Sequence, residues 1–139
     1  SGMVDIILIR THNHNEVVEL AKHSSVPVIN GLTEKFHPCQ LLADMQTFYE
    51  EKGNFEDKKI AWVGDGCNMC NSYINAAKLL NFQLKISTPS GCEPDKKTLS
   101  LASDNVELCD LPGKAVEDCD LVTTDVWTSM GDESDVEKS

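Results

Sequence analysis

Arginine is nearly missing from this sequence, because Arg10 is the only one among 139 residues. Lysine and arginine together number 12 against 23 aspartates and glutamates, which gives a net charge of −11. A nucleic-acid interface needs clustered basic side chains to neutralise phosphates. The charge balance therefore predicts that nucleic acid is not a partner.

Long apolar runs are missing as well. No stretch approaches the roughly 18 consecutive apolar residues that a membrane-spanning helix needs, and no segment has the pattern of a secretory signal peptide. The composition, with 40% hydrophobic and 25% charged residues, is that of a soluble globular protein. We therefore expect a cytoplasmic protein without a membrane partner, whose chain forms one domain or incomplete portions of two.

Six cysteines are present, but the pattern of a secreted disulfide framework is not. Cys67 and Cys70 form a C-x-x-C pair between an apolar run and a helical pattern, so a thiol redox module is one possible interpretation. A zinc site needs more ligands than this pair, and the remaining cysteines form no second close pair. We expect Cys67 and Cys70 to be free thiols, and we expect no metal and no cofactor.

Short apolar runs alternate with helical patterns along the chain. Strands are predicted at 4–9, 26–29, 60–63, 82–86, 106–108 and 121–123. The first strand should be buried, Asn15 should cap the helix after it, and Asn30-Gly31 should turn the chain after the second strand. Strands that alternate with helices predict an α/β fold, with parallel sheets and flanking helices.

One long helix is predicted over residues 38–52. Pro38 suits the first helical position, Gly53 suits the C-terminal cap, and His37 would be the N-cap. Apolar residues recur at helical spacing on one face: Leu41, Leu42, Met45, Phe48 and Tyr49. The N-terminus of this helix, with His37 and Gln40, is a natural site for an anion.

Polar residues follow three of the predicted strands. These are Arg10, the turn 64–68 and the segment 125–130, and open α/β sheets bind ligands at the carboxyl ends of their strands. Each also has a simpler structural interpretation, such as a surface ion pair for Arg10 or a helix cap for Asn68. His12 and His14 are most simply interpreted as solvated loop residues.

Three motifs together resemble the ornithine carbamoyltransferase family. They are His37-Pro-Cys-Gln40, Gly64-Asp-Gly-Cys-Asn68-Met69 and Asp125-Val-Trp-Thr-Ser-Met-Gly131. The resemblance extends from about Val4 to about Glu133, and the third motif separates this family from the aspartate carbamoyltransferases. It implies portions of two Rossmann-like domains joined by a long helix.

The resemblance also implies an activity, namely carbamoyl transfer from carbamoyl phosphate to the δ-amine of L-ornithine, giving L-citrulline and phosphate. Arg10, His37 and Gln40 would contact carbamoyl phosphate, with Arg10 and His37 as the catalytic donors to its carbonyl oxygen. On the other substrate, Asn68 and Asp125 would hold the amino-acid end of ornithine. Ser129 and Met130 would close over it.

The implied organisation assigns residues 3–36 to the later part of a carbamoyl-phosphate domain. Residues 37–53 would be the linking helix, and 54–139 the earlier part of an ornithine domain. The intact protein would be a homotrimer that acts in arginine biosynthesis or catabolism.

Two departures from the family are visible. Cys67 stands where family members usually have a first asparagine before Asn68. The family's phosphate-binding loop and its later substrate-contacting segment fall outside the region of resemblance. We therefore expect this chain alone to form no citrulline. A redox module, or a non-catalytic binding domain of the same fold, remains an alternative.

Overall fold

The structure is a computed structural model, and it describes residues 2–126. Its strands are β1 (Ile7–Arg10), β2 (Val28–Leu32), β3 (Lys59–Val63), β4 (Gln83–Ser87), β5 (Val106–Leu108) and β6 (Leu121–Thr123). Its helices are α1 (His14–His23), α2 (Pro38–Lys52), α3 (Asn68–Leu80), α4 (Lys96–Leu101) and α5 (Pro112–Val116). All the strand pairs are parallel, which confirms the predicted α/β class with parallel sheets. None of these helices combines the length and the apolar character needed to cross a membrane.

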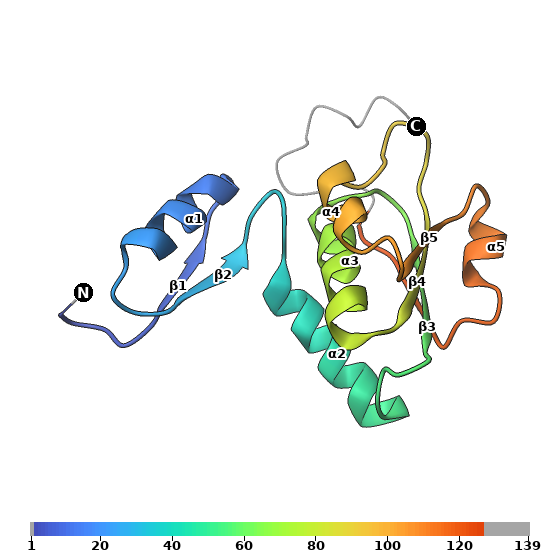
Figure 1. The fold of residues 1–139 in the computed structure, drawn as a ribbon, viewed down its shortest axis with the longest axis horizontal. Coiled ribbons are helices and arrows are strands. Elements are labelled where there is room, and N and C mark those ends of the chain that lie inside the picture. The colour runs from blue at the N-terminus through green and yellow to red at the C-terminus, as the bar shows by residue number, and fades with distance from the viewer. Residues whose placement is uncertain (1, 127–139) are drawn as a thin grey trace.

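The smaller sheet consists of β1 and β2, with α1 connecting them, and lies at one end of the molecule (Figure 1). Val17 is the buried residue of α1. Leu8 is 64% exposed and Ile29 is 39% exposed, so the prediction that the first strand is buried was wrong for this sheet. The reason is that α1 covers one face only, while alternate side chains of a strand point to both faces.

The predicted turn at Asn30 and Gly31 is wrong, because both residues lie inside β2. Ile9 pairs with Asn30 whereas Arg10 pairs with Leu32, so Gly31 is an extra residue in β2. A Cβ on Gly31 would lie 3.0 Å from Leu8 Cδ2 and 3.1 Å from the Ile9 carbonyl oxygen. The irregularity is a β-bulge, a feature that re-aims side chains beside functional sites.

The larger sheet has the strand order β5-β4-β3-β6. Helices α2, α3 and α4 lie on one side of it and α5 on the other (Figure 1). The largest fully buried side chains come from this unit, among them Trp62, Tyr73 and Phe82. Most of the apolar core therefore belongs to the larger sheet and its helices.

The long helix α2 has the predicted bounds, with His37 as N-cap and Gly53 as C-cap. It buries Leu41, Met45 and Phe48, whereas Leu42 and Tyr49 remain exposed. The Phe48 ring stacks on Phe55, with 5.2 Å between the centroids. Helix α2 is thus packed against the larger unit.

Two smaller predictions fail at helix α1. Asn13 rather than Asn15 is its N-cap, because the Asn13 side chain accepts a hydrogen bond from the Asn15 N–H. His14 begins the helix and is only half exposed, so it is not a solvated loop residue.

Candidate functional site

One cavity of about 970 Å³ is lined by the carboxyl ends of β1 and β2, by the first residues of α3, by β6 and the segment after it, and by residues along the length of α2. Of the residues predicted for a site, the cavity is lined by Arg10, His37, Gln40, Asn68 and Asp125. Ser129 and Met130 lie outside the described residues. Asn68 and Asp125 meet because they follow neighbouring parallel strands of the larger sheet, at the edge where open α/β sheets bind ligands. Arg10 ends a strand of the smaller sheet.

The turn between β3 and α3 is shaped by two glycines. Gly64 has a φ of +144°, and a Cβ there would lie 3.2 Å from Thr124 Oγ1. Gly66 donates its N–H to the Cys92 carbonyl at 2.7 Å, and a Cβ on it would lie 2.3 Å from the Pro94 nitrogen. Only glycine fits this close approach of two backbones.

His37 connects the two units at the start of α2. Its backbone N–H donates to Ser72 Oγ at 2.8 Å, which connects the start of α2 to α3. Its Nδ1 atom is buried and has no hydrogen-bond partner. Burial, and then the nearby Arg10, lower the pKa of His37, so the ring is neutral near pH 7. A neutral imidazole has one N–H to donate and one nitrogen to accept.

The first turns of α3 hold the backbone of the loop between β2 and α2. Asn68 Nδ2 donates to the Thr33 carbonyl at 2.8 Å, and Asn71 Nδ2 donates to the Lys35 carbonyl at 3.3 Å. Ser72 accepts from His37, as described. Asn68, Asn71 and Ser72 share one face of the helix because they are three and four residues apart.

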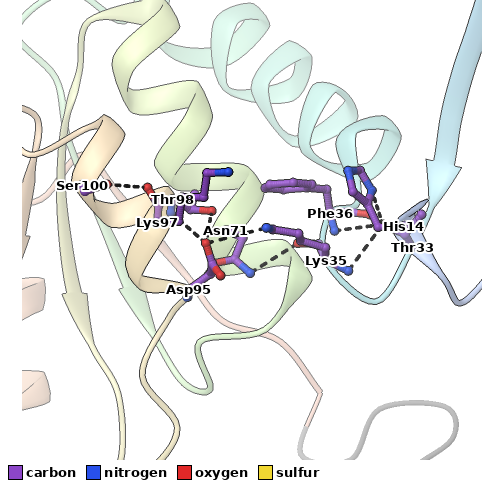
Figure 2. A network of polar contacts seen from close by, with 9 residues as sticks. All are labelled: His14, Thr33, Lys35, Phe36, Asn71, Asp95, Lys97, Thr98 and Ser100. Carbon is purple, nitrogen blue, oxygen red and sulfur yellow. Dashed lines mark hydrogen bonds and ion pairs between the residues drawn. The ribbon is translucent and has the colours of Figure 1, made fainter. Parts of the chain in front are cut away.

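Figure 2 shows the polar contacts that extend from this loop. On one side the His14 Nδ1 atom lies 3.2 Å from Thr33 Oγ1, and the His14 ring packs edge-on against Phe36. On the other side the Asn71 side-chain oxygen accepts from the Asp95 N–H at 3.1 Å. Thr33 is fully buried, so its hydroxyl anchors the loop between the two units.

The Asp44 carboxylate on α2 joins two lining residues, Gln40 of α2 and Tyr73 of α3. Gln40 Nε2 donates to Asp44 Oδ1 at 2.9 Å, and the Tyr73 hydroxyl donates to Asp44 Oδ2 at 2.9 Å. Burial raises the pKa of Tyr73, so its hydroxyl remains a donor. No sequence motif indicates the roles of Asp44 and Tyr73, because both contact a lining residue through the fold rather than through a local pattern.

Cys67 contacts the predicted ligand Asp125. Its Sγ donates to Asp125 Oδ2 at 3.2 Å, while Asp125 Oδ1 accepts from the Val126 N–H at 2.7 Å. Burial, with a smaller contribution from Asp125, raises the pKa of Cys67 to about 11, and burial also raises the pKa of Cys70. A reactive redox pair requires the opposite shift. Both thiols are free in the structure, and their pKa shifts weigh against the redox interpretation.

The cavity is lined by more acidic than basic side chains. Its carboxylates are Glu34, Asp44, Glu51, Asp120 and Asp125, and its permanent cations are Arg10 and Lys52. Such a lining favours a ligand that carries positive charge at one end. Within residues 2–126, no group of three or more His, Cys, Asp or Glu side chains is placed to hold a metal ion.

The fold and the cavity define an α/β protein with a candidate ligand site, which lies at the carboxyl ends of strands from two separate parallel sheets and includes a helix N-terminus. Residues 1–50 match the carbamoyl-P binding domain of the aspartate/ornithine carbamoyltransferases, and residues 56–139 match the Asp/Orn binding domain. The chain therefore belongs to the aspartate/ornithine carbamoyltransferase family, which confirms the resemblance drawn from the motifs.

Individual relatives agree with this assignment. The ornithine carbamoyltransferase of Hydrogenovibrio crunogenus is 52% identical over 138 residues, which are 99% of this chain and 46% of that protein. The anabolic ornithine carbamoyltransferase of Pseudomonas aeruginosa is 52% identical over 135 residues, 97% of this chain and 44% of that protein. The chain thus spans slightly less than half the length of these relatives.

Solved structures show the same likeness. The ornithine carbamoyltransferase of Pyrococcus furiosus has a TM-score of 0.89 at 43% identity, covering 98% of this chain and 46% of that one. The enzyme of Burkholderia thailandensis has a TM-score of 0.87 at 47% identity, covering 91% of this chain and 44% of that one.

Proposed function

We propose that the protein acts as an ornithine carbamoyltransferase, which moves the carbamoyl group of carbamoyl phosphate to the δ-amine of L-ornithine and releases L-citrulline and phosphate. The observation that carries the proposal is one cavity in which Arg10 and His37 lie beside Asn68 and Asp125. The names of the relatives support the same reaction. We assign residues 3–36 to the carbamoyl-phosphate domain, 37–53 to the linking helix and 54–139 to the ornithine domain.

Arg10, His37 and Gln40 form the carbamoyl-phosphate end of the site. The neutral ring of His37 and the guanidinium of Arg10 donate to the carbonyl oxygen, where negative charge develops when the amine attacks. Removing a donor of this kind typically costs about 3–4 kcal/mol of transition-state stabilisation. The N-terminus of α2 adds its favourable dipole.

Asp125 and Asn68 form the ornithine end. The Asp125 carboxylate pairs with the α-ammonium group, and such a charge-assisted bond is roughly twice as strong as a neutral one. Holding ornithine at this end places its δ-amine for attack. Cys67 holds one oxygen of Asp125 in place, and Ser129 and Met130 close over the substrate.

Charge suggests that the described cavity is better matched to ornithine than to a phosphate dianion. Arg10 is the only arginine of the chain, and carboxylates outnumber the cations that line the cavity. We propose that further basic groups bind the phosphate, and that citrulline formation needs them. We also propose that the intact protein is a cytoplasmic homotrimer that serves arginine metabolism without nucleic acid, membrane or cofactor.

Asp125→Asn in the full gene product tests the proposal. We expect the KM for ornithine to rise by about tenfold or more, as for a lost charge-assisted bond. Carbamoyl phosphate affinity should stay nearly unchanged. Asp104→Asn, a change on the exposed surface, serves as the matched control. Equal losses for the two substrates, or no citrulline from the unmodified protein, would contradict the assignment.

A further inference from the structure

Asp44 lies between two side chains that line the cavity. It is four residues after Gln40 on α2, so the two side chains share one face of the helix. Asp44 accepts from Gln40 Nε2 and from the Tyr73 hydroxyl, both at 2.9 Å, using a different oxygen for each. Tyr73 is 1% exposed and packs on Trp62, with 5.6 Å between the ring centroids. The Gln40 side chain is thereby connected to the rigid core of the larger sheet.

The contact decides which way the Gln40 amide faces. A carboxylate accepts hydrogen bonds and donates none, so only the NH₂ side of the amide can lie against Asp44. The carbonyl oxygen Oε1 is then turned away from Asp44, and it is the acceptor that the amide offers to a ligand in the cavity. Tyr73 occupies the second carboxylate oxygen, which restricts rotation of Asp44 itself.

We propose that Asp44, held by Tyr73, is a positioning residue that keeps the Gln40 carbonyl oxygen directed at the amino group of carbamoyl phosphate. The inference rests on the proposed function, since it assumes that Gln40 contacts this substrate. The amino group of a carbamoyl unit is a hydrogen-bond donor, and it needs an acceptor from the protein. If the Gln40 amide were turned the other way, its NH₂ group would face the amino group of carbamoyl phosphate. Both groups are donors, so neither would have an acceptor.

The proposed role gives the site a chemical preference. An acyl group that carries a methyl in place of the amino group has no N–H to offer Oε1. A site that hydrogen-bonds a substrate group discriminates against analogues that lack it, because the protein atom is then left unpaired. Asp44 should therefore support selection of a carbamoyl over an acetyl group.

Helix α2 contains a matched control for this pair. Gln46 Nε2 donates to Glu50 Oε1 at 2.8 Å, also four residues apart, but neither side chain lines the cavity. The chemistry and the spacing repeat those of Gln40 and Asp44. A change at Glu50 therefore reports what the loss of such a pair does to the helix alone.

The experiment compares two stable analogues on the full gene product by calorimetry. Phosphonoacetamide keeps the amino group, and phosphonoacetone replaces it with a methyl. For Asp44→Asn, whose side chain can donate as well as accept, we expect the Kd of phosphonoacetamide to rise by about tenfold, the size of one hydrogen bond. The Kd of phosphonoacetone should change by less than about twofold. Tyr73→Phe should give a smaller loss in the same direction, and Glu50→Gln should change neither Kd.

The outcomes separate the inference from the proposed function. If Asp44→Asn and Tyr73→Phe weaken both analogues equally, or weaken neither, Asp44 does not orient Gln40 and the inference is wrong while the function stands. Binding of neither analogue by the unmodified protein would overturn the proposed function and the inference with it. Should Asp44→Asn fail to fold, the same comparison with Tyr73→Phe decides.

Discussion

The two sheets of the molecule differ in how they are stabilised. The unit of β1, α1 and β2 contributes Val17 as its buried apolar side chain, and both of its strands expose large apolar residues such as Leu8. The larger sheet, by contrast, forms with α2 and α3 a continuous core that includes Trp62 and Tyr73. Of the residues that line the cavity, Arg10 thus comes from a unit with few buried side chains, whereas His37, Asn68 and Asp125 belong to the larger unit and its helices.

Hydrogen bonds join these units at the loop 33–37. Side chains of α3 donate to or accept from the backbone of this loop. Hydrogen bonds are directional, so they fix the relative orientation of the loop and α3 without needing a large buried area. The larger unit therefore provides the stability, and the junction provides the alignment of the site.

The largest expected effect tests the difference in packing. Leu84→Ala, at a residue that is 1% exposed in β4, should lower the free energy of unfolding by about 2–5 kcal/mol. The same change at Leu8, which is 64% exposed in β1, should cost less than about 0.5 kcal/mol. Urea unfolding of both variants gives the two values. Similar losses would mean that the smaller sheet is packed as tightly as the larger.

The turn between β3 and α3, which positions Cys67 and Asn68, should not tolerate a methyl group at Gly66. Gly66→Ala should destabilise by about 1–3 kcal/mol, because the new Cβ would overlap the Pro94 backbone. Gly113→Ala in α5 is the matched control, since nothing lies within 4 Å of a Cβ there, and it should stabilise by up to about 1 kcal/mol. Thermal unfolding measures both. A neutral Gly66→Ala would show that the two backbones can separate freely.

The junction can be weakened without touching either core. Ser72→Ala removes the acceptor of the His37 N–H and should cost about 1–2 kcal/mol, because a buried donor is left unpaired. Ser100→Ala, at an exposed serine that donates to Lys97, should cost less than about 0.5 kcal/mol. Faster amide hydrogen exchange at His37 in the Ser72 variant would confirm the role of this contact. Unchanged exchange would refute it.

The smallest expected effect links Arg10 of the smaller unit to His37. Arg10→Gln removes a nearby cation, so the pKa of His37 should rise toward its ordinary value while remaining lowered by burial. Since the folded pKa lies below the unfolded one, the contribution of His37 to stability is full above about pH 6.5 and is lost as the pH falls through the folded pKa. The variant should lose less stability on acidification. NMR titration of the His37 ring checks the shift, and an unchanged midpoint would contradict the contact.

Local patterns predicted most of the elements in the larger unit. The caps Pro38 and Gly53, and the apolar periodicity between them, sufficed to place α2, because these signals act within one helix. The strand pattern also accounts for the approach of Asn68 and Asp125, since both follow parallel strands of one sheet. Arg10 lies in the other sheet, so its approach depends on how the two units pack.

The failures have physical causes of another kind. Asn30-Gly31 has the residues of a turn, but in the fold it pairs with β1 and forms a β-bulge. This pairing depends on β1, so no local sequence signal predicts it. His14 and Thr33 meet only because α1 packs against the loop that follows β2. Asp44 was not a candidate because its partner Tyr73 lies 29 residues away on another helix.

The three hydrogen bonds from α3 to the loop 33–37 also determine how the two units can move. They lie within little more than one helical turn, so a rigid rotation of the smaller sheet has its axis near the start of α3. His37 takes part in one of these bonds and would stay nearly fixed, whereas Arg10, carried by β1, would be displaced. A misplacement of about 1 Å can cost about a hundredfold in rate. Under the proposed function, a rotation of this kind would therefore change the rate by changing the distance between Arg10 and His37.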